Sequence, residues 1–323
     1  MTNLLVGIDI GGTKCAVSLG RLSGEGIELI DKRRFSTPRT PHEAIHILAA
    51  GLDQLIAEHS SVGKLSAIGI SCGGPLNSRA GLILSPPNLA GWDRVDIVSP
   101  FRERYGVPTG LQNDANACAL AEWKWGAGRG CEHLIFLTFG TGMGAGLVLN
   151  GQLYAGYNDM AGEVGHIRLD PDGPIGYGKA GSFEGFCSGG GITQMARAFA
   201  TDRIKEGNAP MFCLSETELG AITAQKVGEA ARHGDPLALE IFRLSGVQLG
   251  RTLAVLVDIL NPERIVIGSI YARQRELLEP IVIEELRREA LLMSLESCAI
   301  VPAELGEQVG DYAGMAIALH LIA

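Results

Sequence analysis

One segment of this chain occurs twice, and that repeat constrains the fold more than any other feature. Residues 4–16 read as an apolar strand, a glycine turn and a returning strand, and residues 134–146 repeat the same order. Asp9 in the first copy corresponds to Thr138 in the second. An internal duplication on this scale predicts two related domains that face each other.

The hydrophobic periodicity predicts both strands and helices along the whole chain, which indicates a mixed α/β fold. Asn113 or Asp114 is suited to cap the helix that follows it. We expect strands over 4–10, 15–19, 27–35, 65–71, 107–111, 133–138, 145–149, 264–268 and 298–301, and helices over 41–59, 115–125, 192–200, 224–232, 236–260, 276–292 and 312–322.

The glycines gather at the two turns. The chain has 44 glycines in 323 residues, about twice the usual share. Successive N–H groups in a tight glycine turn can point at one phosphate oxyanion, because no Cβ obstructs the approach. A single glycine hairpin is more often a plain structural turn. Two matched hairpins, one reading Asp-Ile-Gly-Gly-Thr-Lys over 9–14, favour a clamp on a triphosphate.

Two better-known glycine motifs do not fit. The Walker spacing is absent, since Thr13 and Lys14 follow Gly12 directly. Residues 140–145 match a loose dinucleotide fingerprint, but that fingerprint requires a helix to follow. Residues 146–151 read as a strand and a turn, so a nicotinamide dehydrogenase is disfavoured.

The charge and the cysteines of the chain indicate which partners and which cellular compartment suit the protein. The net charge is −9 and no run of five basic residues occurs, which disfavours nucleic-acid and membrane binding. The seven cysteines are scattered without a C-x-x-C pair, a pattern typical of reduced cytoplasmic proteins. The first residues lack a signal-peptide pattern, and the apolar run 253–260 is too short to span a bilayer. We therefore expect a cytoplasmic protein.

Taken in order, the motifs resemble the ROK family of repressors, open reading frames and sugar kinases. Glu184 stands where the family has a third sugar-contacting acid, and the glycine that usually ends the second motif is missing here. The matching segments, which cover the whole chain, are 9–14, 73–75, 87–92, 113–116, 139–144, 162–166 and 265–268.

The resemblance implies a fold and its domains. We expect the actin-like ATPase (ribonuclease H-like) duplicated α/β fold, with two domains and a central cleft. The smaller N-terminal domain would comprise 1–115 plus 309–323, and the larger C-terminal domain 116–308.

The resemblance also implies a function: ATP-dependent phosphorylation of a hexose or N-acetylhexosamine hydroxyl by a homodimer, with no nucleic-acid or membrane partner. Asp114 would be the catalytic base, and Asp9 would hold Mg²⁺ through water. The implied sugar-binding residues are Gly74, Asn88, Asn113, Asp114, Glu163, His166 and Glu184; the implied ATP-binding residues are Asp9, Gly11, Gly12, Thr13, Lys14, Thr138, Gly140, Thr141, Gly142 and Gly268.

Several of these residues have structural alternatives when they are considered singly. Asp114 is equally suited to capping a helix, and a lone histidine such as His166 is more often structural. Lys14 would face either phosphate or solvent. Trp92 would either stack on sugar or pack in the core.

The zinc motif of the family is missing. When the motif is aligned on Glu184, its three cysteine positions fall on Ile175, Tyr177 and Ser182. Structural zinc needs about four nitrogen or sulfur ligands, so we predict no zinc site. We expect packing of Ile175 and Tyr177 to hold residues 170–181 instead.

Two alternative functions come from the same family. Its repressors carry a helix-turn-helix module before the first glycine motif, and here that motif begins at Asp9. The other alternative is a non-catalytic sugar-sensing regulator without its own DNA-binding module. A sensor needs neither a base at Asp114 nor two phosphate hairpins, so the sequence favours the kinase.

Overall fold

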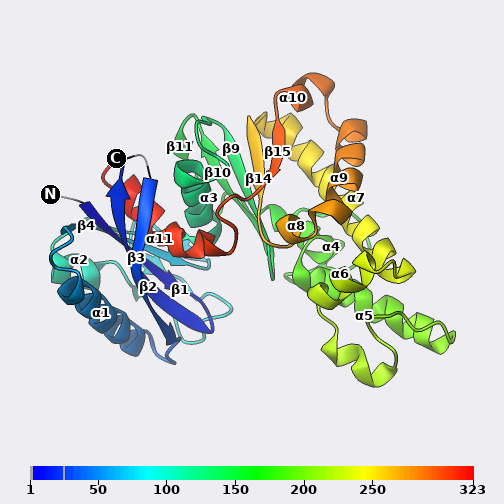
Figure 1. Ribbon diagram of the computed structural model, residues 1–323, viewed down its shortest axis with the longest axis horizontal. Helices are drawn as coiled ribbons and strands as arrows, with labels where there is room; N and C mark the ends of the chain where they lie inside the picture. Colours follow the sequence, from blue (N-terminus) through cyan, green and yellow to red (C-terminus); the bar gives the residue numbers. More distant parts are fainter. Residues whose placement is uncertain (1–2, 25) are drawn as a thin grey trace. The chain divides into compact units, whose positions relative to one another are not determined.

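The computed structural model describes residues 3–24 and 26–323, and its contacts divide them into two compact units (Figure 1). Unit 1 contains the chain up to Phe136, together with Gly146–Gly162 and Glu304–Ala323. Unit 2 contains Leu137–Ala145 and Glu163–Ala303. The mixed α/β class is confirmed in both. The domain boundaries expected from the sequence, at 115/116 and 308/309, stay a prediction.

Unit 1 is built on a five-stranded sheet of order β3-β2-β1-β4-β8. Strands β1, β2 and β3 are antiparallel, whereas β4 runs parallel to both β1 and β8. The bounds are β1 Asn3–Ile10, β2 Lys14–Ser23, β3 Gly26–Ser36, β4 Lys64–Cys72 and β8 Thr109–Asn113.

Helices cover both faces of this sheet, because its strands alternate apolar side chains to either side. On one face, α1 (Pro41–Glu58) packs on the β1 side chains of Leu4, Val6, Ile8 and Ile10. On the other face, Leu5 packs with α3 (Asp114–Trp125) and α11 (Val309–His320).

Helix α11 approaches the sheet through glycines. A Cβ added to Gly314 of α11 would lie 2.6 Å from the Gly7 Cα atom of β1. A Cβ added to Gly69 of β4 would lie 2.0 Å from the Gly314 carbonyl oxygen. Only hydrogen fits at these positions, so the helix backbone rests directly on the two central strands.

The second sheet has the order β11-β10-β9-β14-β15. If the strands of each sheet are numbered 1 to 5 in chain order, both sheets have the order 3-2-1-4-5. A duplication is expected to give this shared order. The bounds are β9 Leu134–Phe139, β10 Met143–Leu149, β11 Gln152–Leu153, β14 Arg264–Ile267 and β15 Ala299–Pro302; β9 and β10 each run from one unit into the other.

Unit 2 is otherwise largely helical. Two of its helices, over 224–232 and 236–260, have the bounds that the sequence predicts. The helices are α4 Phe183–Phe186, α5 Gly189–Lys205, α6 Ala224–Arg232, α7 Pro236–Leu260, α8 Ile270–Arg273, α9 Arg275–Glu289 and α10 Leu292–Glu296. Within the described residues, none of the helices combines the length and apolar character that a membrane span needs.

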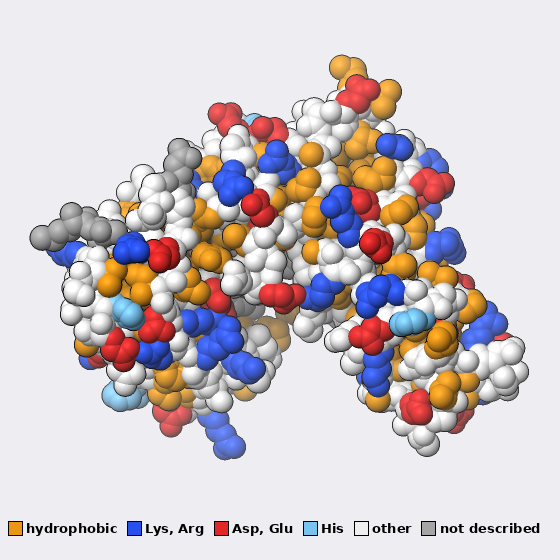
Figure 2. All heavy atoms as spheres, viewed as in Figure 1, with side chains coloured by type: hydrophobic (Ala, Val, Ile, Leu, Met, Phe, Trp, Pro, Cys, Tyr) orange, Lys and Arg blue, Asp and Glu red, His pale blue; other side chains and the backbone are white. Residues whose placement is uncertain are grey.

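The single helix predicted over 276–292 is wrong at its end. Helix α9 stops before Ala290, whose backbone is extended, and α10 begins at Leu292. Between them the Leu291 N–H donates to the Asp258 carboxylate of α7 at 3.0 Å. Leu291, Leu292 and Met293 are exposed at the start of α10, and Figure 2 shows hydrophobic side chains on the surface there.

The shortest elements lie outside the sequence prediction. They are β5 Leu76–Asn77, β6 Leu82–Ile83, β7 Val95–Asp96, α2 Ser99–Tyr105, β12 Ile175–Gly176 and β13 Lys179–Ala180, together with 3₁₀ turns at Val164–His166, Glu216–Ala221 and Gly306–Gln308.

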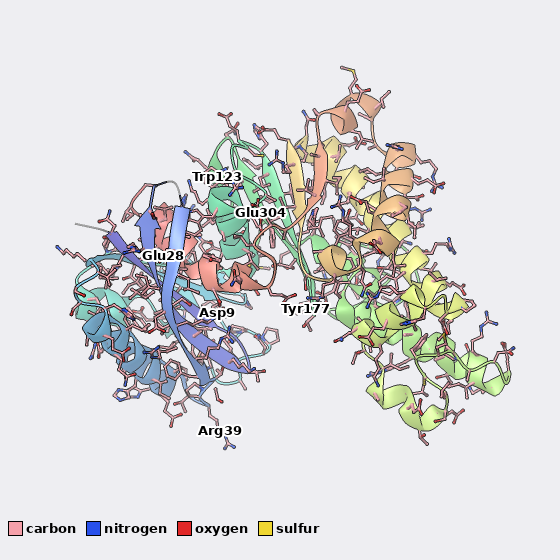
Figure 3. The ribbon with its side chains drawn as sticks, in the orientation of Figure 1. Asp9, Glu28, Arg39, Trp123, Tyr177 and Glu304 are labelled. Atoms are coloured by element: carbon pink, nitrogen blue, oxygen red, sulfur yellow. The ribbon has the colours of Figure 1, made fainter. Side chains whose placement is uncertain are left out.

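Glu122 of α3 is a fully buried carboxylate within unit 1. It accepts hydrogen bonds from the backbone N–H groups of Ala127 at 2.8 Å, Glu304 at 3.2 Å and Leu305 at 2.9 Å. Residue 304 is where the chain returns to unit 1 from unit 2 (Figure 3). The carboxylate therefore fixes the returning chain against the helix that begins at Asp114.

We expect Glu122→Gln to lower the free energy of unfolding by about 2–4 kcal/mol, because a buried N–H group loses its acceptor and an amide NH₂ then faces other donors. Urea unfolding measures the change. The matched control is Glu304→Gln, which removes an exposed ion pair with Arg129 and should cost no more than about 1 kcal/mol. Equal losses in the two variants would show that the buried bonds contribute little.

Candidate active site

Unit 1 brings together residues from four predicted motifs. The first hairpin is closed by the Gly11 N–H, which donates to the Lys14 carbonyl at 3.0 Å. A Cβ added to Gly12 would lie 2.6 Å from the Asn88 carbonyl oxygen, so this glycine lies against the loop that carries Asn88. Lys14 is exposed at the start of β2.

The Gly73–Gly74 turn completes this cluster. A Cβ added to Gly73 would lie 3.9 Å from the Asn88 side-chain amide, and one added to Gly74 would lie 3.3 Å from the Asn113 Nδ2 atom. Asn113 is also paired with Cys72 across β4 and β8. The structure therefore places three residues predicted to bind sugar, Gly74, Asn88 and Asn113, beside Gly12, which the sequence assigns to ATP; their roles stay predictions.

Asn113 is the N-cap residue of α3, and Asp114 is the first residue of the helix. The Ala115 N–H donates to Asn113 Oδ1 at 2.9 Å and to Asp114 Oδ1 at 2.8 Å. Each side chain thus keeps one polar end for another partner: the Asn113 amide NH₂ and the second Asp114 oxygen. Capping and a chemical role are compatible at both positions.

Asp9 and Asp114 are two carboxyl groups of unit 1 that influence each other electrostatically; by accessible surface Asp9 is half-buried and Asp114 is exposed. Burial and the charge of Asp114 raise the pKa of Asp9 to about 6, against a partial opposing effect of Lys32. Burial also raises the pKa of Asp114, although its carboxyl accepts backbone hydrogen bonds that act in the opposite direction. Two adjacent acids that resist ionisation favour a site for a proton or a cation.

Lys32 is a residue near Asp9 that sequence reasoning missed. It lies on β3, forms an ion pair with Asp311 of α11, and is close enough to Asp9 to act on its pKa. Burial lowers the pKa of Lys32 itself. It sits in a charged run from Asp31 to Arg34, in which the sequence pattern gives no sign of which side chain faces the site.

Unit 2 holds the second hairpin, Gly140–Gly144, in a fixed shape. The Thr138 hydroxyl oxygen accepts from the Gly144 N–H at 2.9 Å, and the Gly140 N–H donates to the Gly142 carbonyl at 3.2 Å. Gly268 is tied to the same region, since its N–H donates to the Leu137 carbonyl at 3.0 Å.

Glu184 is joined to this hairpin. Its Oε2 atom accepts from the Met143 N–H at 3.1 Å. A Cβ added to Gly142 would lie 2.8 Å from that same oxygen, and one added to Gly165 would lie 3.4 Å from the Glu184 Cβ atom. The structure thus places a predicted sugar-binding acid beside a predicted phosphate-binding turn.

Glu163 precedes a 3₁₀ turn over Val164–His166 and His166 ends it, and both side chains are exposed. The His166 ring makes an edge contact with the Tyr177 ring, with centroids 6.2 Å apart, and the His166 carbonyl accepts from Lys179 Nζ at 2.7 Å. Because the Gly165 position sits against the Met143 carbonyl, this turn is packed on the second hairpin.

The expectation that Ile175 and Tyr177 pack to hold residues 170–181 is wrong. Their side chains are 55% and 73% exposed. Backbone hydrogen bonds hold the segment instead: the Leu169 and Asp170 N–H groups both donate to the Gly181 carbonyl, at 2.8 and 3.1 Å. The prediction that this segment binds no zinc stays a prediction.

Side chains from beyond the segment reinforce it. Arg168 Nη1 donates to the Ala180 carbonyl at 2.9 Å, and Gln194 Oε1 of α5 accepts from the Ile175 N–H at 2.6 Å. Ser182 then caps α4 by accepting from the Gly185 N–H at 3.1 Å. Glu184 lies on that short helix, so its position is fixed from both ends.

Trp92 belongs to the core of unit 1. Its side chain is only 1% exposed and packs with the α1 face of the sheet, which decides between the two roles that the sequence left open.

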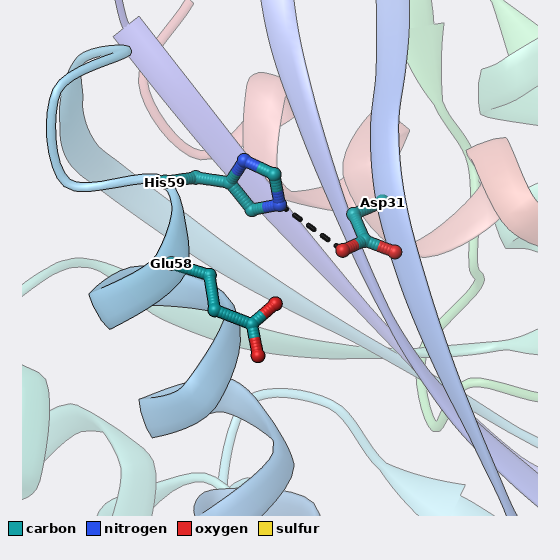
Figure 4. Close-up of side chains that lie close together, drawn as sticks. All are labelled: Asp31, Glu58 and His59. Carbon is teal, nitrogen blue, oxygen red and sulfur yellow. Dashed lines mark hydrogen bonds and ion pairs between the residues drawn. The ribbon is translucent and has the colours of Figure 1, made fainter.

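Outside these clusters, Asp31, Glu58 and His59 form a group whose ligand atoms lie within 4.8 Å of one another (Figure 4). His59 Nε2 lies 3.0 Å from Asp31 Oδ2. Arg33 donates to Asp31 at 2.7 Å and also to Glu58, so its guanidinium already lies between the carboxylates. We interpret the group as an ion-pair network that joins β3 to the end of α1.

Comparison with known proteins decides the family. The family model described as "ROK family" matches residues 5–321. The chain belongs to the ROK family. A glucokinase from Halalkalibacterium halodurans is 32% identical to this ROK protein over 96% of its chain and 93% of the relative.

Two further relatives bear on fold and function. The structure of a ROK family glucokinase from Streptomyces griseus, in complex with glucose and AMPPNP, matches with a TM-score of 0.76 and 29% identity, over 98% of this chain and 99% of that one. The transcriptional regulator NagC of Escherichia coli is 27% identical, over 95% of this chain and 74% of its own. The actin-like ATPase fold predicted from the sequence is confirmed by these structural matches.

We expect Asp9→Asn to stabilise the ligand-free protein at pH 8 by about 1–3 kcal/mol. The folded-state pKa of about 6 lies above the unfolded value of 3.8, so the wild type loses stability as pH rises between these values. The advantage of the variant should grow from pH 4.5 to pH 6 and then level off, as measured by urea unfolding. A difference that does not change with pH would show that Asp9 titrates normally.

Proposed function

We propose that this protein is an ATP-dependent sugar kinase that transfers the γ-phosphate of ATP to a hydroxyl of a hexose or an N-acetylhexosamine. The observation that carries the proposal is the Asp114 carboxyl. It stands at the start of α3 with a raised pKa, beside Asn113 and close enough to Asp9 to raise the pKa of that acid. The glucokinase relatives support the same reaction.

Asp114 would act as the general base. A sugar hydroxyl becomes a better nucleophile as its proton is taken, and a base with a raised pKa accepts that proton readily. One Asp114 oxygen is held by the Ala115 N–H, which orients the other. The free NH₂ of Asn113 would hold a neighbouring hydroxyl, because its oxygen is already used in the cap.

The residues present fit a magnesium ion. Asp9 supplies a hard oxygen ligand at the end of β1, and its raised pKa shows that the site disfavours a bare negative charge. When bound, Mg²⁺ neutralises charge on the transferred phosphate. Asp9 would hold the ion through water, and Asp114 would remain the proton acceptor.

The second hairpin would hold phosphate through backbone amides. The amides of Gly140, Met143 and Gly144 already donate within unit 2, so we assign those of Thr141 and Gly142 to the nucleotide. The hydroxyl of Thr138 shapes the turn rather than donating to the phosphate. Glu184, Glu163 and His166 would bind the remaining sugar hydroxyls.

A second candidate function is a sugar-sensing regulator, because NagC is also a relative. A regulator would bind sugar without turnover and would not need a base. The assay below separates the two functions, since only the kinase releases ADP in a way that depends on Asp114.

We expect Asp114→Asn to lower kcat by about 10²–10⁴-fold, the usual contribution of a general base. The amide keeps the hydrogen bond to the Ala115 N–H, so the helix cap survives. A coupled ADP-release assay with Mg-ATP and a panel of hexoses and N-acetylhexosamines measures the loss and names the substrate.

The matched control is Asp235→Asn at the N-cap of α7, whose carboxylate accepts from the Ala238 N–H of that cap and from the Met211 N–H and belongs to none of the predicted motifs. It should keep kcat within about twofold. If no sugar gives ADP above the Asp114→Asn background, while sugars still raise the Tm, the kinase assignment is withdrawn and the regulator is supported.

A further inference from the structure

A cavity of about 450 Å³ lies on unit 1, and none of its lining residues is among the site residues named above. Its volume is within the range of about 300–1,000 Å³ that is usual for small-molecule sites. Two segments form it: the turn between β5 and β6, and the loop that follows β11. Its lining residues are Asn77, Arg79, Ala80, Tyr157, Asn158 and Asp159.

Hydrogen bonds fix the two walls to each other. Asp159 accepts from the Ser78 N–H at 2.9 Å and from the Ser78 hydroxyl at 2.6 Å. Asn77 Oδ1 accepts from the Ala80 N–H at 2.9 Å, which holds the turn. A preformed cavity avoids the entropy cost of ordering its walls when something binds.

Because these bonds use the side-chain oxygens of Asp159 and Asn77, hydrogen-bond donors predominate among the groups left to bind a ligand. Both Asp159 oxygens are used by Ser78, and the Asn77 oxygen is used by Ala80, so the remaining polar groups are mainly donors. The Arg79 guanidinium is exposed, and no ion pair engages it within the residues that the structure describes.

Tyr157 supplies an aromatic surface. Its side chain is 95% exposed, although a tyrosine ring has a large apolar face that is normally covered. A pyranose ring has the complementary surface, with a face of C–H groups and a rim of hydroxyls. The C–H face would cover the Tyr157 ring, while Arg79 and the asparagine amides would hold the hydroxyls.

Other ligand classes fit less well. An anion would face a single cation and the Asp159 carboxylate, and an apolar ligand would leave Arg79 and two amides without partners. A neutral polyhydroxylated ring satisfies both the aromatic face and the donors.

One wall of the cavity continues in sequence from the predicted sugar loop. Hairpin β5–β6 begins two residues after Gly74, and the Leu84 N–H donates to the Pro75 carbonyl at 2.9 Å at its base. The other wall runs on in sequence to Glu163, four residues after Asp159. Resting on the proposed function, we propose that this cavity is a second carbohydrate subsite for a pyranose ring, most simply the second ring of a disaccharide substrate.

The test compares glucose and N-acetylglucosamine with maltose, cellobiose and N,N′-diacetylchitobiose, by ADP release and by calorimetry. We expect Tyr157→Ala and Arg79→Ala each to weaken disaccharide KM or Kd by about five- to tenfold, while kcat and KM for the monosaccharide stay within about twofold. The matched control is Tyr154→Ala, which removes another exposed tyrosine of unit 1 that does not line the cavity and should change neither.

The outcomes separate this proposal from the proposed function. Monosaccharide turnover with no binding of any disaccharide, and no second equivalent of free sugar, overturns the subsite and leaves the kinase intact. A second equivalent of free monosaccharide that Tyr157→Ala abolishes supports the same cavity with an unlinked ring. If the wild type releases no ADP with any sugar, the kinase fails, and calorimetric disaccharide binding that is lost in both variants still supports the subsite.

Discussion

The backbone contact between α11 and the first sheet is the constraint on which the rest of unit 1 depends. Gly314 meets Gly7 and Gly69 at distances that leave no room for a Cβ atom. The helix can therefore lie on the two central strands and, with α3, bury Leu5 between them. These contacts hold strand β1 in place, and Asp9 is the penultimate residue of that strand. The position of the Asp9 carboxyl thus depends on glycines that let α11 lie directly on the strand that carries it.

That position is energetically unfavourable for the empty protein. Burial and the charge of Asp114 both oppose ionisation of Asp9, and its pKa of about 6 records the cost. A structure selected for stability alone would not place the half-buried Asp9 carboxyl within the electrostatic influence of a second acid. Lys32 offsets part of the cost, but burial lowers its own pKa, and it is also paired with Asp311. The remaining unfavourable charge raises the pKa of Asp9, which favours a proton or a cation beside it.

The sequence predicts features that depend on neighbouring residues and misses features that depend on contacts between distant parts of the chain. Helices α6 and α7 begin and end where the sequence predicts, because their caps at Thr223 and Asp235 are local signals. Both glycine hairpins and the cap at Asn113 are local in the same sense. The break after α9 depends on a hydrogen bond to Asp258, and the role of Lys32 depends on α11, so neither is visible in a local pattern. Strands of two residues, such as β5 and β12, carry no periodicity to detect.

Backbone hydrogen bonds, which side-chain patterns do not reveal, hold residues 170–181 in front of Glu184. Without the family cysteines, we expected apolar packing to replace the metal, yet Ile175 and Tyr177 face solvent. The Gly181 carbonyl instead accepts two N–H groups, and Gly181 itself has a φ of 63°, a conformation that few other residues adopt. A Cβ there would lie 2.0 Å from the Asp170 carbonyl oxygen, so glycine is required twice over. The bonds lead directly into the Ser182 cap and thence to Glu184. Glu184 is therefore held by a backbone network that begins at the Gly181 carbonyl and ends with the Glu184 carboxylate beside Gly142.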